Sequence, residues 1–259
     1  NRLQKSIPLP IRPAGVALNP SGSRVMISDF TRDLVVIDIG SGKTERQITH
    51  PNWIQQAKFV GNDQFASICW DQTLRIWDSV IQEPQRFDLN DLPTRLATAD
   101  HTLLVATVSS ITGYQRSIDS SHWKRRFRVR TDNDATKRIA IHPNEMSWLS
   151  CNANGLNQLW SIDGNQIAEF HDDGPVVMCH YSKDGRWIAT LSETGSVHVR
   201  DARSGDLMAP TLRGKTAITE IQWNAERLLL GGNDRDRYWL SALDLPETWT
   251  KSNLNSNRN

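Results

Sequence analysis

The side chains that could perform covalent or acid–base chemistry are scattered along the chain and form none of the familiar catalytic spacings. No GxSxG, HExxH, CxxC or glycine-rich phosphate-binding motif occurs among the 259 residues. The cysteines Cys69, Cys151 and Cys179 lie far apart in apolar runs, without the nearby His or Cys partners that a metal site needs. We therefore expect buried free thiols in a reducing, cytoplasmic setting, with no cofactor and no metal, and we predict that the chain is not an enzyme.

One segment concentrates charge of a single sign. Its cations, with Trp123 and Phe127 between them, are Lys124, Arg125, Arg126, Arg128 and Arg130. Interleaved cations and aromatic rings can bind single-stranded nucleic acid or another anionic ligand. Strand alternation would send Arg126, Arg128 and Arg130 to one face and Phe127 and Val129 to the other, as on an edge strand whose charges resist edge-to-edge association. We favour such a solvated edge, and nucleic-acid binding by residues 122–138 stays open as an alternative.

The overall composition is that of a globular protein with no strong field of its own. Hydrophobic residues make up 38% and charged residues 23%, and the net charge of +1 attracts neither nucleic acid nor a membrane in bulk. No apolar run approaches the length of about 20 residues that spans a bilayer, so we expect no membrane partner. The sequence begins NRLQKSIPLP, without an initiator Met or the apolar stretch of a signal peptide, and we interpret it as a piece of a longer protein.

The elements that must position these residues repeat along the chain. Stretches of similar pattern recur about every 40 residues. Their starts lie near Ala14, Trp53, Pro93, Thr136, Gly174 and Thr216. Each stretch has an apolar strand, a polar turn, a second apolar strand, a tight turn, an alternating third strand and a more polar return. Short strands at regular spacing predict an all-β protein, and a repeating four-stranded unit predicts a β-propeller, whose blades are these units.

The repeats resemble WD repeats over nearly the whole chain, from about Ala14 to Leu243. Trp77-Asp78 is the family's dipeptide in full, and the other units carry altered pairs such as Arg200-Asp201 and Trp160-Ser161. The resemblance implies a rigid scaffold that holds protein partners. The run SGDLMAPTLRGKTAITEIQW also resembles linkers in WD-repeat arrays that follow bacterial serine/threonine kinase or NTPase-switch domains, which implies a larger signalling protein.

The resemblance also implies a hydrogen-bonded structural network in each blade. In the second unit all four members have candidates, namely His50, Ser67, Asp71 and Trp77. A buried indole N–H and imidazole each need a partner, and the carboxylate can orient the imidazole ring. The fifth unit keeps His171 and Thr190, and the fourth keeps Ser150 and Trp160. We therefore expect the complete network only in the second blade.

Six third strands indicate a six-bladed ring in one domain, residues 1–248, followed by a polar tail, residues 249–259. The last unit has no convincing fourth strand after Leu243, and Leu3–Leu9 has the length of one strand. We predict that this N-terminal strand completes the last blade and closes a monomeric ring. A seven-bladed ring, or a truncated one with an open apolar edge, is the alternative.

In WD-repeat proteins partners most often dock where the turns between second and third strands meet the loops that enter the first strands. The residue that points outward before this turn is Phe30 in the first repeat, Trp70 in the second and Ser109 in the third, so we expect an aromatic pair of Phe30 and Trp70, with Trp53 in the same region. Polar contacts would come from Arg32, Arg235 and Arg237, which places the protein-docking site on the last, first and second blades. Besides nucleic-acid binding, a propeller enzyme with an axial site is the remaining alternative, and the identity of the protein partner is open.

Overall fold

The computed structural model describes residues 6–29, 31–78, 83–117, 122–131, 136–214, 218–224, 227–234 and 237–244. All regular elements within these ranges are β-strands, paired in antiparallel sheets. The described residues contain no helix that is long and apolar enough to cross a membrane. The chain divides into two compact units, Asn1–Arg130 and Thr131–Asn259, which are described separately below.

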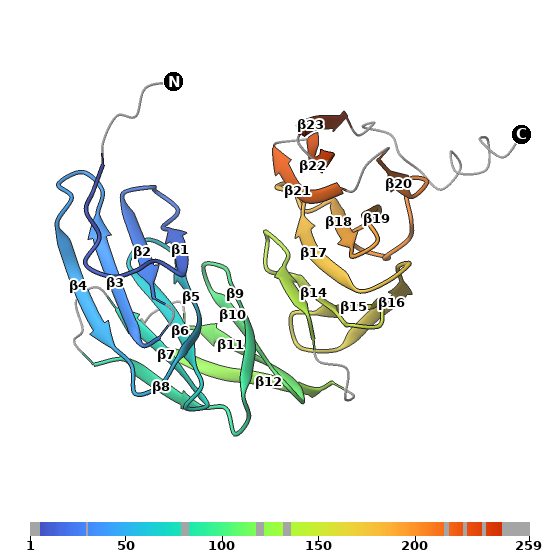
Figure 1. Ribbon diagram of the computed structural model, residues 1–259. Coiled ribbons are helices and arrows are strands. Elements are labelled where there is room, and N and C mark those ends of the chain that lie inside the picture. Colours follow the sequence, from blue (N-terminus) through green and yellow to red (C-terminus); the bar gives the residue numbers. More distant parts are fainter. Residues whose placement is uncertain are drawn as a thin grey trace, which may run out of the picture. The chain divides into compact units, whose positions relative to one another are not determined.

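Unit 1 contains three four-stranded sheets, coloured blue to green in Figure 1. Sheet 1 consists of β1 (Gly15–Leu18), β2 (Arg24–Ser28), β3 (Asp33–Asp38) and β4 (Thr44–Thr49). Sheet 2 consists of β5 (Ile54–Val60), β6 (Gln64–Cys69), β7 (Thr73–Asp78) and β8 (Gln85–Asp88). Sheet 3 consists of β9 (Pro93–Thr98), β10 (Thr102–Thr107), β11 (Ser110–Arg116) and β12 (Trp123–Arg130).

Unit 2 contains two four-stranded sheets and one of three strands among its described residues. Sheet 4 consists of β13 (Arg138–Ile141), β14 (Ser147–Cys151), β15 (Leu156–Ser161) and β16 (Gln166–His171). Sheet 5 consists of β17 (Val176–Tyr181), β18 (Trp187–Ser192), β19 (Ser196–Asp201) and β20 (Leu212–Arg213). Sheet 6 consists of β21 (Ile218–Asn224), β22 (Arg227–Asp234) and β23 (Arg237–Asp244).

The residue patterns explain which strand of each sheet lies inside. The second strands are continuous apolar or small-residue runs, and β6, β10 and β18 are buried at every position. Such runs are typical of strands that are covered on both faces. The fourth strands alternate between half-buried and exposed residues, as in β8 and β16, because only one face of an outermost strand meets a neighbour.

The cores lie between consecutive sheets of each unit. In unit 1, Phe59, Phe65 and Trp77 of sheet 2 pack with Met26, Leu34 and Val36 of sheet 1. The opposite face of sheet 2 packs on sheet 3 through a second buried cluster that includes Leu74, Leu103 and Trp123. In unit 2, one cluster joins sheets 4 and 5 and another joins sheets 5 and 6. Each sheet thus buries its apolar faces only by stacking on its neighbours, as repeat architectures do.

The six predicted repeats are confirmed as six sheets in the described residues, and five of them have four strands. The predicted closing strand, Leu3–Leu9, lies partly outside these residues, and positions 6–9 form no strand. Ile7 packs instead against buried residues of sheet 1. Sheet 6 leaves Tyr238 and Leu240 of β23 exposed, at 89% and 74%. Closure of the ring therefore stays a prediction.

A buried histidine links sheets 4 and 5 at the turn before β18. Gly185 adopts a left-handed φ of +74°, and its carbonyl oxygen lies 2.9 Å from Nε2 of His142. A Cβ at Gly185 would overlap the His142 ring, whereas a Cβ at Gly22, with a φ of +70°, would meet nothing within 4 Å. Both positions therefore require a residue that tolerates a left-handed φ, but only position 185 must also lack a Cβ because the His142 ring fills the space.

We expect Gly185→Ala to lower the free energy of unfolding by about 1–3 kcal/mol more than Gly22→Ala, because both carry the left-handed penalty and only the first displaces a buried ring. Urea unfolding of the two variants measures the difference. Equal losses would show that the contact between His142 and Gly185 imposes no steric constraint.

Candidate functional site

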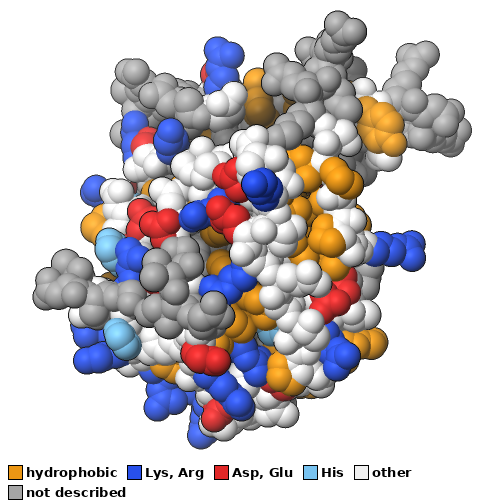
Figure 2. All heavy atoms as spheres, turned by 90° about the vertical axis from the view of Figure 1, so that its left-hand side faces the viewer, with side chains coloured by type: hydrophobic (Ala, Val, Ile, Leu, Met, Phe, Trp, Pro, Cys, Tyr) orange, Lys and Arg blue, Asp and Glu red, His pale blue; other side chains and the backbone are white. Residues whose placement is uncertain are grey.

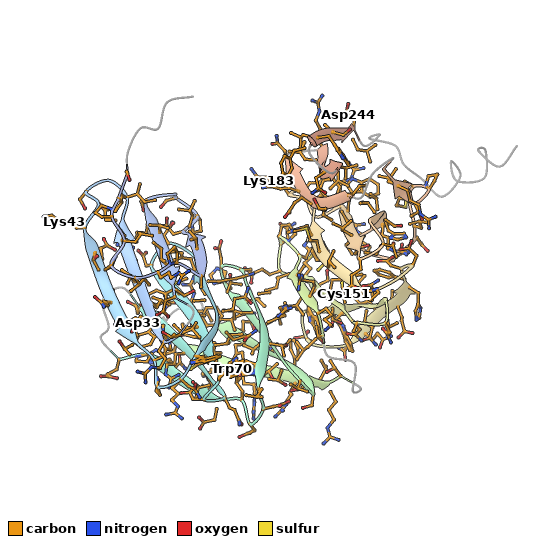
Figure 3. The ribbon with its side chains drawn as sticks, in the orientation of Figure 1. Asp33, Lys43, Trp70, Cys151, Lys183 and Asp244 are labelled. Carbon is orange, nitrogen blue, oxygen red and sulfur yellow. The ribbon has the colours of Figure 1, made fainter. Side chains whose placement is uncertain are left out.

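Two tryptophans lie side by side and half exposed at one end of sheet 2. Trp53 precedes β5 and Trp70 follows β6, with exposures of 51% and 45%. Their ring centroids are 5.2 Å apart with an interplanar angle of 40°. The backbone N–H of Trp70 donates to the carbonyl of Trp53 at 2.9 Å, and its indole N–H donates to Oε1 of Gln55 at 2.8 Å. Trp70 is labelled in Figure 3. The indole hydrogen bond therefore fixes the Trp70 ring, and both tryptophans stay about half exposed.

The turn that carries Trp70 holds a residue in an unfavourable conformation. Gln72 has a φ of +62°, and its N–H donates to the carbonyl of Cys69. Glycine occupies the equivalent turn positions in sheets 4 and 5, at Gly155 and Gly195. A left-handed conformation costs a non-glycine residue about 1–2 kcal/mol. Strain of this kind gathers at functional positions.

Sheet 3 presents apolar side chains at the equivalent positions. Leu92 precedes β9 and Val108 follows β10, with exposures of 44% and 45%. The N–H of Val108 donates to the carbonyl of Leu92, which repeats the bond between Trp70 and Trp53. Sheets 2 and 3 are neighbours, because the N–H of Leu96 donates to Oε1 of Gln56 and a common core lies between them. We call Trp53, Trp70, Leu92 and Val108 the apolar surface.

Sequence reasoning missed Leu92 and Val108, because it aligned Ser109 with Trp70. The residue that shares the backbone hydrogen bond of Trp70 is Val108. The polar turn after Val108 was a signal for the correct alignment, because an apolar residue directly before such a turn lies at the end of a sheet and not in a core. In sheet 5 the same bond joins Glu193 to Pro175, so the apolar character at this position does not extend to that sheet.

The carboxylates beside this surface are engaged in their own turns. Partial burial favours the neutral acid of Asp29, but hydrogen bonds from Thr31 and Asp33 outweigh it and lower its pKa. Asp91 follows the same pattern: hydrogen bonds from Ser109 and Leu92 overcome burial and lower its pKa. Both residues are thus anionic at neutral pH. Asp91 fixes the loops that carry Leu92 and Val108, and Asp29 fixes the sheet 1 turn whose Thr31 carbonyl accepts the N–H of Ile54.

The structure describes only some of the predicted docking residues. Phe30 and Arg235 lie outside the described residues, so the predicted pair of Phe30 and Trp70 is not described. Arg237 begins β23 in unit 2, paired in register with Asp234. Arg32 is exposed, and its carbonyl accepts the N–H of His50 at 2.8 Å. Among the described residues, the aromatic ring next to Trp70 is that of Trp53, and the apolar surface includes residues of sheet 3.

Beneath the tryptophans, three buried side chains form a hydrogen-bonded network. Ser67 Oγ lies 2.8 Å from His50 Nε2 and accepts the indole N–H of Trp77 at 3.0 Å. The His50 and Trp77 rings meet edge to face at 5.7 Å. Burial and the positive charge of Arg75 lower the pKa of His50 to about 4, so the imidazole is neutral. His50, Ser67 and Trp77 therefore join the loop before β5 to β6 and β7.

Asp71, the fourth expected member, does not orient the imidazole. It accepts a hydrogen bond from Thr73 and forms an ion pair with Arg75 at 2.6 Å, while His50 Nδ1 has no hydrogen-bond partner among the described residues. Burial opposes ionisation of Asp71, but the bonds from Arg75 and Thr73 lower its pKa to about 2. The carboxylate is drawn away because Arg75, on the adjacent strand, offers a charged partner within the same turn.

The family comparison matches this blade. The WD domain, G-beta repeat family matches residues 42–78, which span β4 to β7 and include the network. The chain therefore contains a WD repeat. A comparison with curated proteins found no match. The match covers one repeat. Among the described residues, four of the other sheets repeat the four-stranded plan with altered residues and sheet 6 has three strands, which is consistent with a WD-repeat propeller.

A second buried network, in sheet 5, was not predicted. Asp172, with a fully buried side chain, accepts a hydrogen bond from Thr190 at 2.6 Å and pairs with Arg200 at 2.9 Å. Arg200 occupies the position of the repeat's tryptophan, and its guanidinium stacks 4.2 Å from the Phe170 ring. The expected member His171 contributes only its carbonyl, which accepts from Arg200. Because Arg200 replaces the tryptophan, its positive charge explains why a buried carboxylate, Asp172, lies at the centre of this network.

Sheet 4 keeps a reduced form of the WD network. The indole N–H of Trp160 donates to Ser150 Oγ at 2.9 Å, as Trp77 does to Ser67. The Trp160 ring stacks on Trp148, whose ring centroid is 5.0 Å away. Here the serine serves a single aromatic donor.

The basic segment forms β12, an edge strand of sheet 3, as expected. A bulge changes the predicted faces: Arg126 is skipped in the register, and Arg125 pairs with Tyr114. Arg125, Arg128 and Arg130 therefore share one face, in place of Arg126, Arg128 and Arg130. Burial raises the pKa of Tyr114 to about 12, although the nearby charges of Arg125 and Arg128 oppose this rise. Trp123 is buried, with 1% of its surface exposed.

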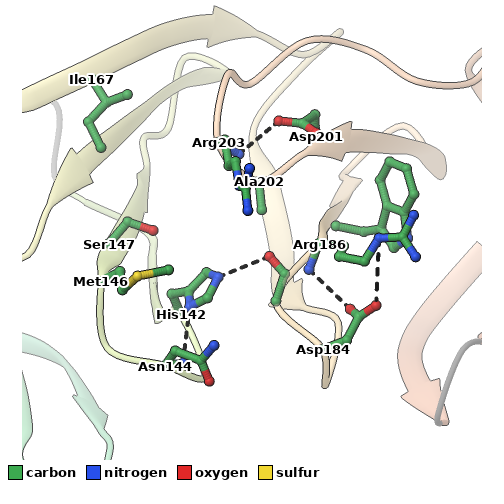
Figure 4. A pocket seen from close by; sticks show the side chains of 12 residues that line it. His142, Asn144, Met146, Ser147, Ile167, Asp184, Arg186, Asp201, Ala202 and Arg203 are labelled. Carbon is green, nitrogen blue, oxygen red and sulfur yellow. Dashed lines mark hydrogen bonds and ion pairs between the residues drawn. The ribbon is translucent and has the colours of Figure 1, made fainter. Parts of the chain in front are cut away.

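A cavity of about 620 Å³ lies in unit 2 (Figure 4). Its lining includes His142, Met146, Asp184 and Arg203, and its carboxylates are bonded within their own turns. No group of three or more His, Cys, Asp or Glu in the described part of the chain could hold a metal ion. The three cysteines are free and buried, although Cys151 and Cys179, distant in sequence, are neighbours in one core.

We expect Ser67→Ala to lower the free energy of unfolding by about 2–5 kcal/mol, because it leaves both Trp77 Nε1 and His50 Nε2 buried without a partner. Ser150→Ala is the matched control: the serine is equally buried but serves one donor, so its loss is about 1–3 kcal/mol. Urea unfolding measures both values. A loss for Ser67→Ala no larger than that for Ser150→Ala would contradict the shared network.

The lowered pKa of His50 predicts a specific pH dependence. Below about pH 6.5 the unfolded chain takes up a proton that folded His50 rejects until about pH 4, so stability falls as pH drops through this window. The contribution is on the order of 3 kcal/mol. Urea unfolding at pH 7 and pH 4 should show that the wild-type chain loses more stability than His50→Gln, which cannot titrate. Equal losses would show that His50 is protonated in the folded state.

Proposed function

We propose that the chain is a non-catalytic protein-docking module and that the apolar surface binds the partner. WD40 repeats generally mediate protein–protein interaction and scaffolding. The observation that carries the assignment is the exposed Trp53–Trp70 pair, held by the hydrogen bonds of Trp70 to Trp53 and Gln55. Exposed aromatic side chains that are already ordered are favoured in binding hot spots, because little conformational entropy is lost on binding.

The exposed area is large enough to matter energetically. About half of each indole surface is accessible, so a partner that covered both rings would remove roughly 200 Å² from water. At about 25 cal/mol per Å² this contributes on the order of 5 kcal/mol before the entropic cost of association. Leu92 and Val108 extend the same surface. A complementary partner would therefore present apolar side chains to these ends of sheets 2 and 3.

Charge plays a secondary part in this proposal. The net charge is +1, and on the face drawn in Figure 2 Lys and Arg side chains are interspersed with Asp and Glu. Such a surface gives no long-range attraction for a polyanion. The proposal places the module in a reducing, cytoplasmic setting, which the free cysteines support. Its place in a larger signalling protein is supported by the linker-like run that begins at Ser204.

Trp53→Ala/Trp70→Ala should weaken binding of the captured partner by at least about 30-fold, because a single hot-spot residue contributes about 2 kcal/mol or more. The partner is captured from the source cell, identified by mass spectrometry and titrated in purified form. Val16→Ala/Leu18→Ala is the matched control, since these residues of β1 are 67% and 61% exposed and also apolar. Undiminished binding by the tryptophan variant, or equal loss by the control, would refute the assignment.

A further inference from the structure

β12 has one edge that pairs with no other strand in the described part of the chain, and it has a high density of positive charge. It is the terminal strand of sheet 3, in the order β12-β11-β10-β9 (Figure 1). Its eight residues include no carboxylate. The exposed cations are Lys124, Arg125, Arg126, Arg128 and Arg130. An edge strand of this length offers a template for another strand unless something opposes pairing.

The backbone of Trp123, the first residue of β12, already pairs with a side chain in place of a neighbouring strand. The N–H of Trp123 donates to Oε1 of Gln85 at 2.8 Å, and its carbonyl accepts from Nε2 of Gln85 at 2.6 Å. The side-chain amide of Gln85 thus makes the two hydrogen bonds that a neighbouring strand would make. Both backbone groups of Trp123 face away from β11, so this edge is able to pair.

The register places Arg125, Arg128 and Arg130 on the same face of β12 as Trp123. Trp123, Arg125, Arg128 and Arg130 stand opposite every second residue of β11, from Arg116 to Ser110. In an antiparallel ladder, alternate residues direct their N–H and C=O groups to the same side. The backbone groups of Arg125, Arg128 and Arg130 therefore face outward as those of Trp123 do, and the three guanidinium groups share one face. The bulge at Arg126 is what brings Arg125 into this set.

We propose that β12 binds an acidic, extended segment of a protein partner by strand addition, at a site separate from the apolar surface. The added backbone would pair with the outward N–H and C=O groups of Arg125, Arg128 and Arg130. Every second side chain of the segment would be Asp or Glu, opposite these arginines, because cross-strand pairs of opposite charge stabilise a sheet. Side chains between them would pack beside Phe127 and Val129, which are half-buried on the other face.

Several observations favour a peptide over other occupants. Residues two apart on a strand are about 7 Å apart, which is the spacing of alternate side chains on the added strand. A nucleic acid has no backbone that satisfies paired N–H and C=O groups, and it gains from exposed aromatic rings on which bases stack. Trp123 is buried and Phe127 is half-buried, so β12 provides no such platform. A second copy of β12 would place arginine opposite arginine, which opposes self-pairing.

The test measures fluorescence anisotropy of the full chain with a labelled peptide of alternating Glu and Thr, as long as β12. Two further peptides carry N-methyl groups on alternate residues. In one peptide the methylated N–H groups lie on one edge of the strand, and in the other peptide they lie on the opposite edge. One set should weaken binding by about tenfold or more and the other should not, since only one edge faces β12. Arg130→Glu should weaken binding by about tenfold, and Lys124→Glu, with the same charge change on the other face, by at most about threefold.

An oligouridylate of the same charge and Trp53→Ala/Trp70→Ala separate this proposal from its alternatives. The peptide should bind more tightly than the oligouridylate, and the tryptophan variant should bind the peptide as the wild-type chain does. Equal effects of the two N-methyl sets, equal effects of the two Glu variants, or tighter binding of the oligouridylate would overturn strand addition. Loss of peptide binding in the tryptophan variant would move the site to the apolar surface.

Discussion

The structure of sheet 2 depends on the need to satisfy polar groups that lie between packed sheets. Sheet 1 covers one face of sheet 2 and sheet 3 covers the other, so the indole N–H of Trp77 and the imidazole of His50 cannot reach water. Ser67 serves the indole N–H of Trp77 and Nε2 of His50. Because His50 lies before β5, this pairing also holds the loop that carries Trp53. The N–H of Ile54 donates to the carbonyl of Thr31, which ties the same loop to sheet 1. The position of the exposed tryptophan therefore follows from a buried polar requirement.

The other sheets meet the same requirement with different residues. In sheet 5, a buried carboxylate at Asp172 gathers Thr190 and Arg200, and the arginine replaces the aromatic donor. In sheet 4, Ser150 serves only Trp160. A repeat can therefore lose the family's residues and keep its architecture, provided that each buried donor retains an acceptor. This explains why a family match covers residues 42–78 while the four-stranded plan recurs elsewhere.

The sequence was a good guide to the sheets and a poorer guide to the contacts at their ends. Alternation and turn residues predicted the repeating units, because strand periodicity is a local property. The link between Asp71 and Arg75 was missed, since both sequence and family pattern directed Asp71 toward His50. Asp172 was missed because its partners lie on other strands. The bulge at Arg126 could not be read from alternation, which assumes an unbroken period of two. The exposure of Leu92 and Val108 depends on the register of each turn, and one residue of misalignment concealed it.

The central claim is that the ends of sheets 2 and 3, at Trp53, Trp70, Leu92 and Val108, form the protein-docking surface. Amide hydrogen exchange of the full chain, with and without its captured partner, tests this claim most directly. The account predicts slower exchange in the loops before β5 and β9 and in the turns after β6 and β10 when the partner is bound. Slower exchange confined to the opposite turns, around Asn62 and Asp100, with no change at the tryptophans, would contradict it.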